Sequence, residues 1–164
     1  MNENTYAKIT KLIYSHKYGP QILKAINNST VILVYCLYLI LLMILAYNHD
    51  ARFWRVLLTP GISFVLVSIF RKVFNASRPY EVLNIDSIIK KDTKGKSFPS
   101  RHVFSIFVIS TAFYYILPPM GVVLMFLGIL LALARVLGGV HFPRDVIAGA
   151  IIGILSGTIG FTLF

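Results

Sequence analysis

Long uncharged stretches alternate with short polar clusters along the chain. Residues 29–47 and 146–164 are each nineteen residues without Asp, Glu, Lys or Arg, and 53–70 contains only Arg55. A helix of this length crosses a hydrocarbon core of about 30 Å at a rise of about 1.5 Å per residue. We therefore predict a membrane span in each of these three stretches.

The longest uncharged stretch, 103–134, has 32 residues and is too long for one ordinary span. Pro118 and Pro119 lie near its middle, and proline removes a helix hydrogen bond, so we predict two short helices joined by a tight turn. The pattern predicts an all-α, polytopic transmembrane helical bundle of about five spans over residues 29–164, with no separate soluble domain. A hydrophobic content of 57% agrees with this class.

The first 28 residues have a different pattern, in which apolar residues are interleaved with four lysines. This pattern is typical of a helix that lies in the membrane surface. Gly19-Pro20 is predicted to break that helix in two. We therefore interpret residues 1–28 as an amphipathic interfacial segment and 29–164 as the membrane domain.

The chain is strongly basic, with 16 Lys and Arg residues against six acids and a formal net charge of +10. Such a balance is often interpreted as nucleic-acid binding. Here the basic residues flank membrane spans, so we expect anionic lipid headgroups or a phosphorylated lipid substrate as partners, and no nucleic acid.

Polar residues of the types used in catalysis and anion binding occur at four span boundaries: 71–80, 98–102, Arg135 and 141–145. An even number of predicted crossings separates each of these boundaries from the next. All four clusters are therefore predicted to lie on one face of the membrane, where they can form one site.

The side chains of this predicted site suit phosphate chemistry. They are Arg71, Lys72, Arg78, Ser100, Arg101, His102, Arg135, His141 and Asp145. Arginine forks bind phosphate oxygens, and the start of a helix near Ser100 offers free N–H groups. Two histidines and a carboxylate can supply a nucleophile or base, an orienting group and an acid. Asp145 is the only acid in the four clusters, so we expect neither a metal site nor a cofactor.

Each of these residues also has a simpler structural interpretation. Cations at span ends are commonly interfacial anchors, Ser100 is a possible helix cap, and Asp145 suits the positive end of a helix. The placement of all of them on one face favours a functional site. A stripe of small residues at Gly149, Gly153 and Gly157 predicts close helix packing instead.

Three segments, "RKVFNASRP", "PSRH" and "ARVLGGVHFPRD", resemble the three-part signature of the type 2 phosphatidic acid phosphatase superfamily. This family includes bacterial phosphatidylglycerophosphate and undecaprenyl-diphosphate phosphatases. The resemblance covers residues 71–145 and departs from the family pattern at three positions. Arg71 replaces a lysine, Arg101 a glycine and Ala134 a serine.

The resemblance implies a role for each matching residue. His141 would attack phosphorus, Asp145 would orient its ring, and His102 would protonate the leaving oxygen and then activate water. The phosphate oxygens would be held by Arg71, Arg78, Ser100 and Arg135, with help from Arg101. The implied function is a metal-independent membrane lipid phosphatase acting on a lipid phosphate or diphosphate through a phosphohistidine. A lipid phosphotransferase and a non-catalytic anionic-lipid-binding membrane protein are the alternatives.

Two arguments about membrane orientation disagree. With five spans, 14 of the 16 Lys and Arg residues, including Lys90 and Lys91, fall on the motif face, and only Arg52 and Arg55 fall on the other. The positive-inside rule places such a face in the cytoplasm. The resemblance implies an integral protein of the bacterial plasma membrane that works on its outer face. The charge bias makes a cytoplasmic site our prediction.

Overall fold

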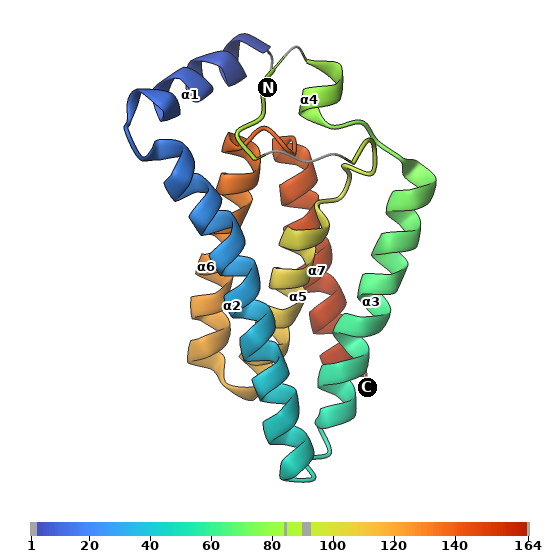
Figure 1. Cartoon of the computed structure of the whole chain (residues 1–164). Helices are drawn as coiled ribbons and strands as arrows, with labels where there is room; N and C mark the ends of the chain where they lie inside the picture. Colours follow the sequence, from blue (N-terminus) through green and yellow to red (C-terminus); the bar gives the residue numbers. More distant parts are fainter. Residues whose placement is uncertain (1–2, 84, 90–92, 164) are drawn as a thin grey trace.

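The computed structural model describes residues 3–83, 85–89 and 93–163, and every regular element in these ranges is a helix. In chain order the helices are α1 (Glu3–Ser15), α2 (Gly19–Tyr47), α3 (Phe53–Phe74), α4 (Pro79–Val82), α5 (Arg101–Ile116), α6 (Pro118–Leu137) and α7 (Pro143–Leu163). Five of them form an elongated bundle, and α1 and α4 lie across one end of it (Figure 1). The predicted all-α class is confirmed.

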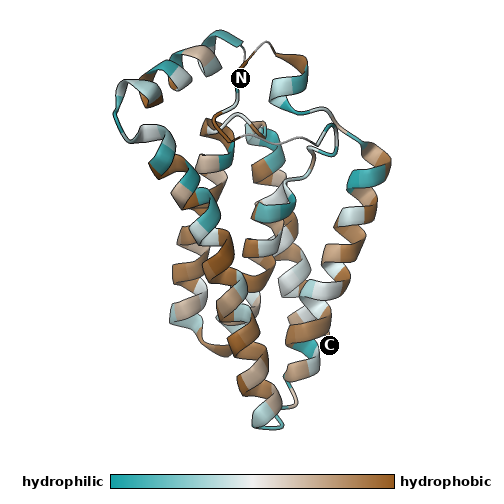
Figure 2. Ribbon diagram, viewed as in Figure 1, coloured by the Kyte–Doolittle hydropathy of each residue, from teal (hydrophilic) through white to brown (hydrophobic). Residues whose placement is uncertain are grey.

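Four helices, α2, α3, α6 and α7, are long and apolar enough to cross a membrane by length and composition. The fifth bundle helix, α5, is apolar but has only 16 residues. Hydrophobic residues dominate the long helices, whereas hydrophilic ones gather at the end that carries α1 and α4 (Figure 2). The residues predicted to form spans thus lie in four candidate membrane helices and one shorter apolar helix.

The predicted helix breaks occur at both proline sites. Helix α5 ends at Ile116 and α6 begins at Pro118, although α6 is not short, with 20 residues. Helix α1 ends at Ser15 and α2 begins at Gly19, so α2 starts well before the uncharged stretch at residue 29. The reason is that a charge such as Lys24 limits the hydrocarbon core without ending a helix, which can continue into the interface.

Helix α5 lies at the centre of the bundle. All of its residues from Val103 to Phe113 are buried, and it packs against α2, α3, α6 and α7. Its closest partner is α7, because a Cβ at Gly153 would lie 2.7 Å from the Phe104 carbonyl oxygen and a Cβ at Gly149 would lie 2.7 Å from that of Ser100, the residue before α5. The close packing predicted from the glycine stripe is confirmed, and it places the starts of α5 and α7 side by side.

The polar clusters converge at one end of the bundle. The end of α3, the start of α5, the end of α6 and the start of α7 all lie at the end covered by α1 (Figure 1). The α2–α3 connection, with Arg52 and Arg55 close by, lies at the opposite end. Lys90 and Lys91, which were counted on the motif face, lie outside the described residues.

Candidate active site

Two buried arginines tie the three motif segments together. Arg71, in the last turn of α3, donates hydrogen bonds to the carbonyls of Lys96, Ser97 and Pro99. Arg78 donates to the carbonyl of Gly95 at 3.0 Å and to that of Val140 at 3.1 Å. Their guanidinium groups therefore hold the loop before α5 against the loop before α7. Lys72, beside Arg71, is exposed, so the buried cation of the pair is Arg71.

His141 occupies the loop between α6 and α7 and is 1% exposed. Its Nδ1 lies 3.5 Å from Oδ2 of Asp145 and 3.3 Å from Oγ of Ser97. The Ser97 hydroxyl donates to the same Asp145 oxygen at 2.5 Å, and the Phe142 N–H donates to it at 3.0 Å. A hydroxyl and a carboxylate thus lie close to Nδ1 of the imidazole, an arrangement that can fix its tautomer and leave the other ring nitrogen as the nucleophile.

The surroundings of His141 keep its ring neutral. Burial lowers the pKa of His141, and the charges of Arg78 and Arg135 lower it further, against the opposing effect of Asp145. Only the neutral imidazole has a lone pair available for attack on phosphorus. The protonation state of this side chain therefore suits a nucleophile.

Two buried donors of the site have no hydrogen-bond partner within the described part of the chain. They are Oγ of Ser100 and Nε of Arg135, and both side chains are almost fully buried. Leaving a buried charged donor unpaired is costly, and an anion that accepts from it removes that cost. Ser100 also donates its backbone N–H to the Asp145 carbonyl at 2.8 Å, which joins the starts of α5 and α7. The geometry fits an anion-binding pocket at the start of α5.

The remaining two predicted residues, Arg101 and His102, lie in the first turn of α5. Arg101 is exposed, and its guanidinium lies 5.2 Å from the ring centroid of Phe64 on α3, a cation–π contact. His102 is half-buried at the same N-terminal end of α5. The structure thus brings seven of the nine residues to the buried site or its rim, whereas Lys72 is exposed and Arg101 points toward α3.

Sequence reasoning missed three residues of this site: Ser97, Glu81 and Tyr6. Glu81 accepts from the backbone N–H groups of Arg78 and Gly95, both at 2.6 Å, and so joins the first two motifs. Its position three residues after Arg78 is that of the acid in a capping box, which is a partial signal because Arg78 is not the Ser or Thr of the usual pattern. Tyr6 has no such local signal, because its contact with His141 joins residues 135 positions apart.

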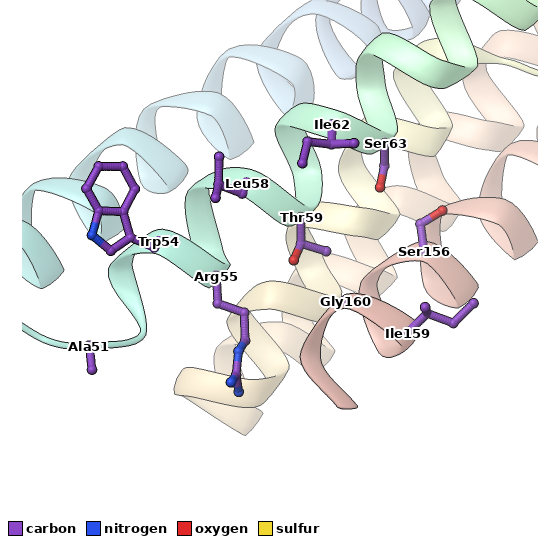
Figure 3. A pocket seen from close by; sticks show the side chains of 10 residues that line it. All are labelled: Ala51, Trp54, Arg55, Leu58, Thr59, Ile62, Ser63, Ser156, Ile159 and Gly160. Carbon is purple, nitrogen blue, oxygen red and sulfur yellow. The ribbon is translucent and has the colours of Figure 1, made fainter. Parts of the chain in front are cut away.

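A groove of about 510 Å³ at the opposite end of the bundle is a different feature (Figure 3). It lies between α3 and α7, and its lining includes Trp54, Arg55 and Leu58 but no histidine or acid. The groove therefore lacks the groups that phosphoryl transfer needs, and the candidate active site is the cluster around His141.

A family model described as the PAP2 superfamily matches residues 52–164, which include all nine predicted site residues. The chain belongs to this superfamily. The resemblance to type 2 phosphatidic acid phosphatases, a family of membrane lipid phosphatases, is confirmed.

One curated relative matches part of the chain. The chain is 30% identical over 105 residues to the bacitracin transport permease protein BcrC of Bacillus licheniformis, and this match covers 61% of the chain and 51% of BcrC. The chain thus spans about half the length of this curated relative.

Two crystal structures share the fold. That of LpxE from Aquifex aeolicus has a TM-score of 0.75 and 26% identity, over 98% of this chain and 94% of the other. That of a transmembrane PAP2 type phosphatidylglycerolphosphate phosphatase from Bacillus subtilis has a TM-score of 0.67 and 20% identity, over 98% and 84%. The chain is an integral membrane protein.

Proposed function

We propose that the protein is a metal-independent membrane lipid phosphatase that hydrolyses a lipid phosphate or diphosphate through a phosphohistidine on His141. The observation that supports this most directly is the environment of His141. Its ring is buried and neutral, is flanked by Ser97 and Asp145, and lies in the same cluster as the buried cation Arg135.

In the proposed reaction, the ring nitrogen of His141 that does not face Asp145 attacks phosphorus, and the bond from phosphorus to the lipid oxygen breaks. His102 gives its proton to the departing oxygen. Asp145 stabilises the positive charge that develops on the imidazole. His102 then takes a proton from water, the resulting hydroxide attacks phosphorus, and cleavage of the P–N bond releases inorganic phosphate and restores neutral His141.

The phosphate oxygens are bound by Ser100 Oγ and Arg135 Nε, the two buried donors without a partner. The N-terminus of α5 adds its positive dipole end, and Arg71 and Arg78 add charge while they hold the surrounding loops. Fixed donors of this kind stabilise the transition state in phosphoryl transfer more than they stabilise the ground state.

The lipid chain of the substrate fits a second groove, of about 470 Å³, between α2, α3 and α5. Its lining is largely apolar and includes Tyr35, Tyr38 and Phe64. Phe64 also contacts Arg101 at the mouth of α5. We infer that the substrate phosphate lies at the helix mouth and that its chain runs from there along this groove into the bilayer.

In the proposed topology all five bundle helices cross the membrane, and residues 1–28 form a segment that lies in the membrane interface. Helix α5, at about 24 Å by its length, spans less than a full hydrocarbon core. Because it is enclosed by the other four helices, its ends do not have to meet lipid. The short central helix therefore fits a site that sits slightly below the membrane surface.

The test is the release of inorganic phosphate by purified protein from phosphatidate, phosphatidylglycerophosphate and undecaprenyl diphosphate. We expect activity in excess EDTA and inhibition by vanadate, which mimics five-coordinate phosphorus. His141→Ala should lower kcat about a thousandfold or more, since no other side chain of the third motif can attack. The control is His49→Ala, because His49 is exposed and lies in the α2–α3 connection, away from the motif segments.

Three outcomes would contradict parts of this proposal. Near-normal turnover in His141→Ala would contradict a phosphohistidine intermediate on His141. Activity that is lost in EDTA and restored by Mg²⁺ would contradict the metal-independent mechanism. Phosphate found on a lipid acceptor instead of in solution would identify a phosphotransferase.

A further inference from the structure

Helix α1 lies outside residues 52–164, the part of the chain that the family model matches. It nevertheless reaches the proposed nucleophile. Tyr6 is 1% exposed, and its hydroxyl donates a hydrogen bond to the backbone carbonyl of His141 at 3.1 Å. The N–H of His141 donates to the Arg135 carbonyl at 3.3 Å. The backbone of His141 is thus held from both sides, once by α6 and once by α1.

We propose that Tyr6 is a positioning residue of the enzyme, which keeps His141 aligned for attack by fixing its backbone carbonyl from α1. This inference rests on the proposed role of His141 as the nucleophile. Asp145 and Ser97 restrain the imidazole ring itself. Without a second restraint on the backbone, the loop between α6 and α7 could rotate the ring away from its target.

The turn between α1 and α2 fixes the placement of α1. A Cβ at Gly19 would collide with the carbonyl oxygen of Ile13, so the tight turn between α1 and α2 needs glycine at this position. The turn folds α1 back across the end of the bundle, where it packs against α2 and α6 (Figure 1). Tyr6 is the one buried residue of α1 within its described length.

The chemistry of Tyr6 suits a permanent donor. Burial, with a further contribution from the charge of Asp145, raises the pKa of Tyr6 to about 12. Its hydroxyl therefore stays protonated at every pH at which a phosphatase is assayed. A buried tyrosine hydroxyl needs a partner, and here that partner is the carbonyl of His141.

The same helix provides a matched control. Tyr14 is 59% exposed, and Tyr14→Phe removes an equivalent hydroxyl from α1 without touching the site. Tyr6→Phe keeps the buried ring and removes only the donor. We expect Tyr6→Phe to lower kcat about three- to tenfold, the usual effect of one intramolecular hydrogen bond, and Tyr14→Phe to leave it unchanged.

The experiment compares both variants with the wild-type protein on p-nitrophenyl phosphate and on the lipid phosphate that the wild type hydrolyses fastest. For Tyr6→Phe, KM should stay within about twofold, because the phosphate-binding donors are untouched. Rapid-quench measurement should show slower formation of the phosphoenzyme. Hydrogen–deuterium exchange of the segment 138–142 should become faster in Tyr6→Phe and not in Tyr14→Phe.

The outcomes separate this inference from the proposed function. Absence of phosphatase activity in the wild type would overturn both. An active wild type with Tyr6→Phe equal to it in kcat would overturn the inference about Tyr6 alone. Faster exchange with unchanged kcat would also overturn it, since Tyr6 would then be only structural. A rise in KM with unchanged kcat would place Tyr6 in substrate binding and contradict the positioning role.

Discussion

At the residue scale, the site depends on a hydroxyl that belongs to none of the three motif segments. Oγ of Ser97 lies 2.5 Å from the Asp145 carboxylate and 3.3 Å from the His141 ring, whereas the ring and the carboxylate are themselves 3.5 Å apart. The hydroxyl can donate to the carboxylate and accept from the ring at the same time. Ser97 therefore links the proposed nucleophile to its orienting acid.

Ser97→Ala should lower kcat about tenfold to a hundredfold with little change in KM, because it loosens the ring without removing a phosphate ligand. Ser110→Ala is the matched control. Ser110 is also fully buried, but its hydroxyl donates to the Ile106 carbonyl at 2.7 Å within α5. Steady-state kinetics of the two variants, normalised to folded protein, check the prediction. Wild-type kcat in Ser97→Ala would show that the direct contact with Asp145 is sufficient.

At the element scale, the contact between α5 and α7 sets the geometry of the site. Ser100 is the N-cap residue of α5 and Asp145 lies in the first turn of α7, and they share a backbone hydrogen bond of 2.8 Å. Below them, the glycines of α7 let the two helix backbones approach closely. A larger residue in this stripe would separate the helices and move two motifs apart.

Gly153→Ala should destabilise the protein by about 1–3 kcal/mol, since the new methyl group would lie 2.7 Å from the Phe104 carbonyl oxygen. Gly61→Ala is the control on α3, where a Cβ would meet nothing within 4 Å. There the higher helix propensity of alanine should leave stability unchanged or raise it by up to about 1 kcal/mol. Thermal unfolding of both variants in the same detergent provides the comparison, and equal midpoints would contradict tight packing at Gly153.

At the scale of the whole molecule, the two ends of the bundle differ strongly in charge. Arg52, one of the two cations assigned to the end opposite the site, forms an ion pair of 2.6 Å with Asp50. Hydrogen bonds from Arg52 lower the pKa of Asp50 to about 2, so the pair stays formed at neutral pH. This pairing leaves that end close to neutral and increases the contrast with the basic end. The positive-inside rule counts Lys and Arg residues and not net charge, and by that count the motif end, with 14 of the 16, is predicted to be cytoplasmic.

The orientation can be measured with single thiols. Cys36, the only cysteine, is replaced by serine, and Thr93→Cys and Ala51→Cys then place one exposed thiol at the motif end and at the opposite end, respectively. A membrane-impermeant maleimide applied to intact cells should label Ala51→Cys and spare Thr93→Cys until the cells are permeabilised. The reverse pattern would place the active site on the outer face.

Much of this architecture was predictable because the signals are local in the chain. Uncharged stretches of span length predict membrane helices, and Pro118 marks the turn between α5 and α6. Since each span reverses the direction of the chain, counting the spans was enough to predict that His102, Arg135 and His141 lie at one end of the bundle. The spacing within the three motifs was enough to indicate the superfamily.

The remaining features depend on contacts between distant segments, for which a single sequence has no local pattern. The sequence does not show that Ser97 faces Asp145, because this follows from the way α5 packs on α7. It also does not show that Tyr6 reaches His141, since an interfacial helix has many possible orientations and its position is decided by the turn at Gly19. Local patterns therefore determined which residues are proposed to carry the chemistry. Packing in three dimensions determined which neighbours hold them in place.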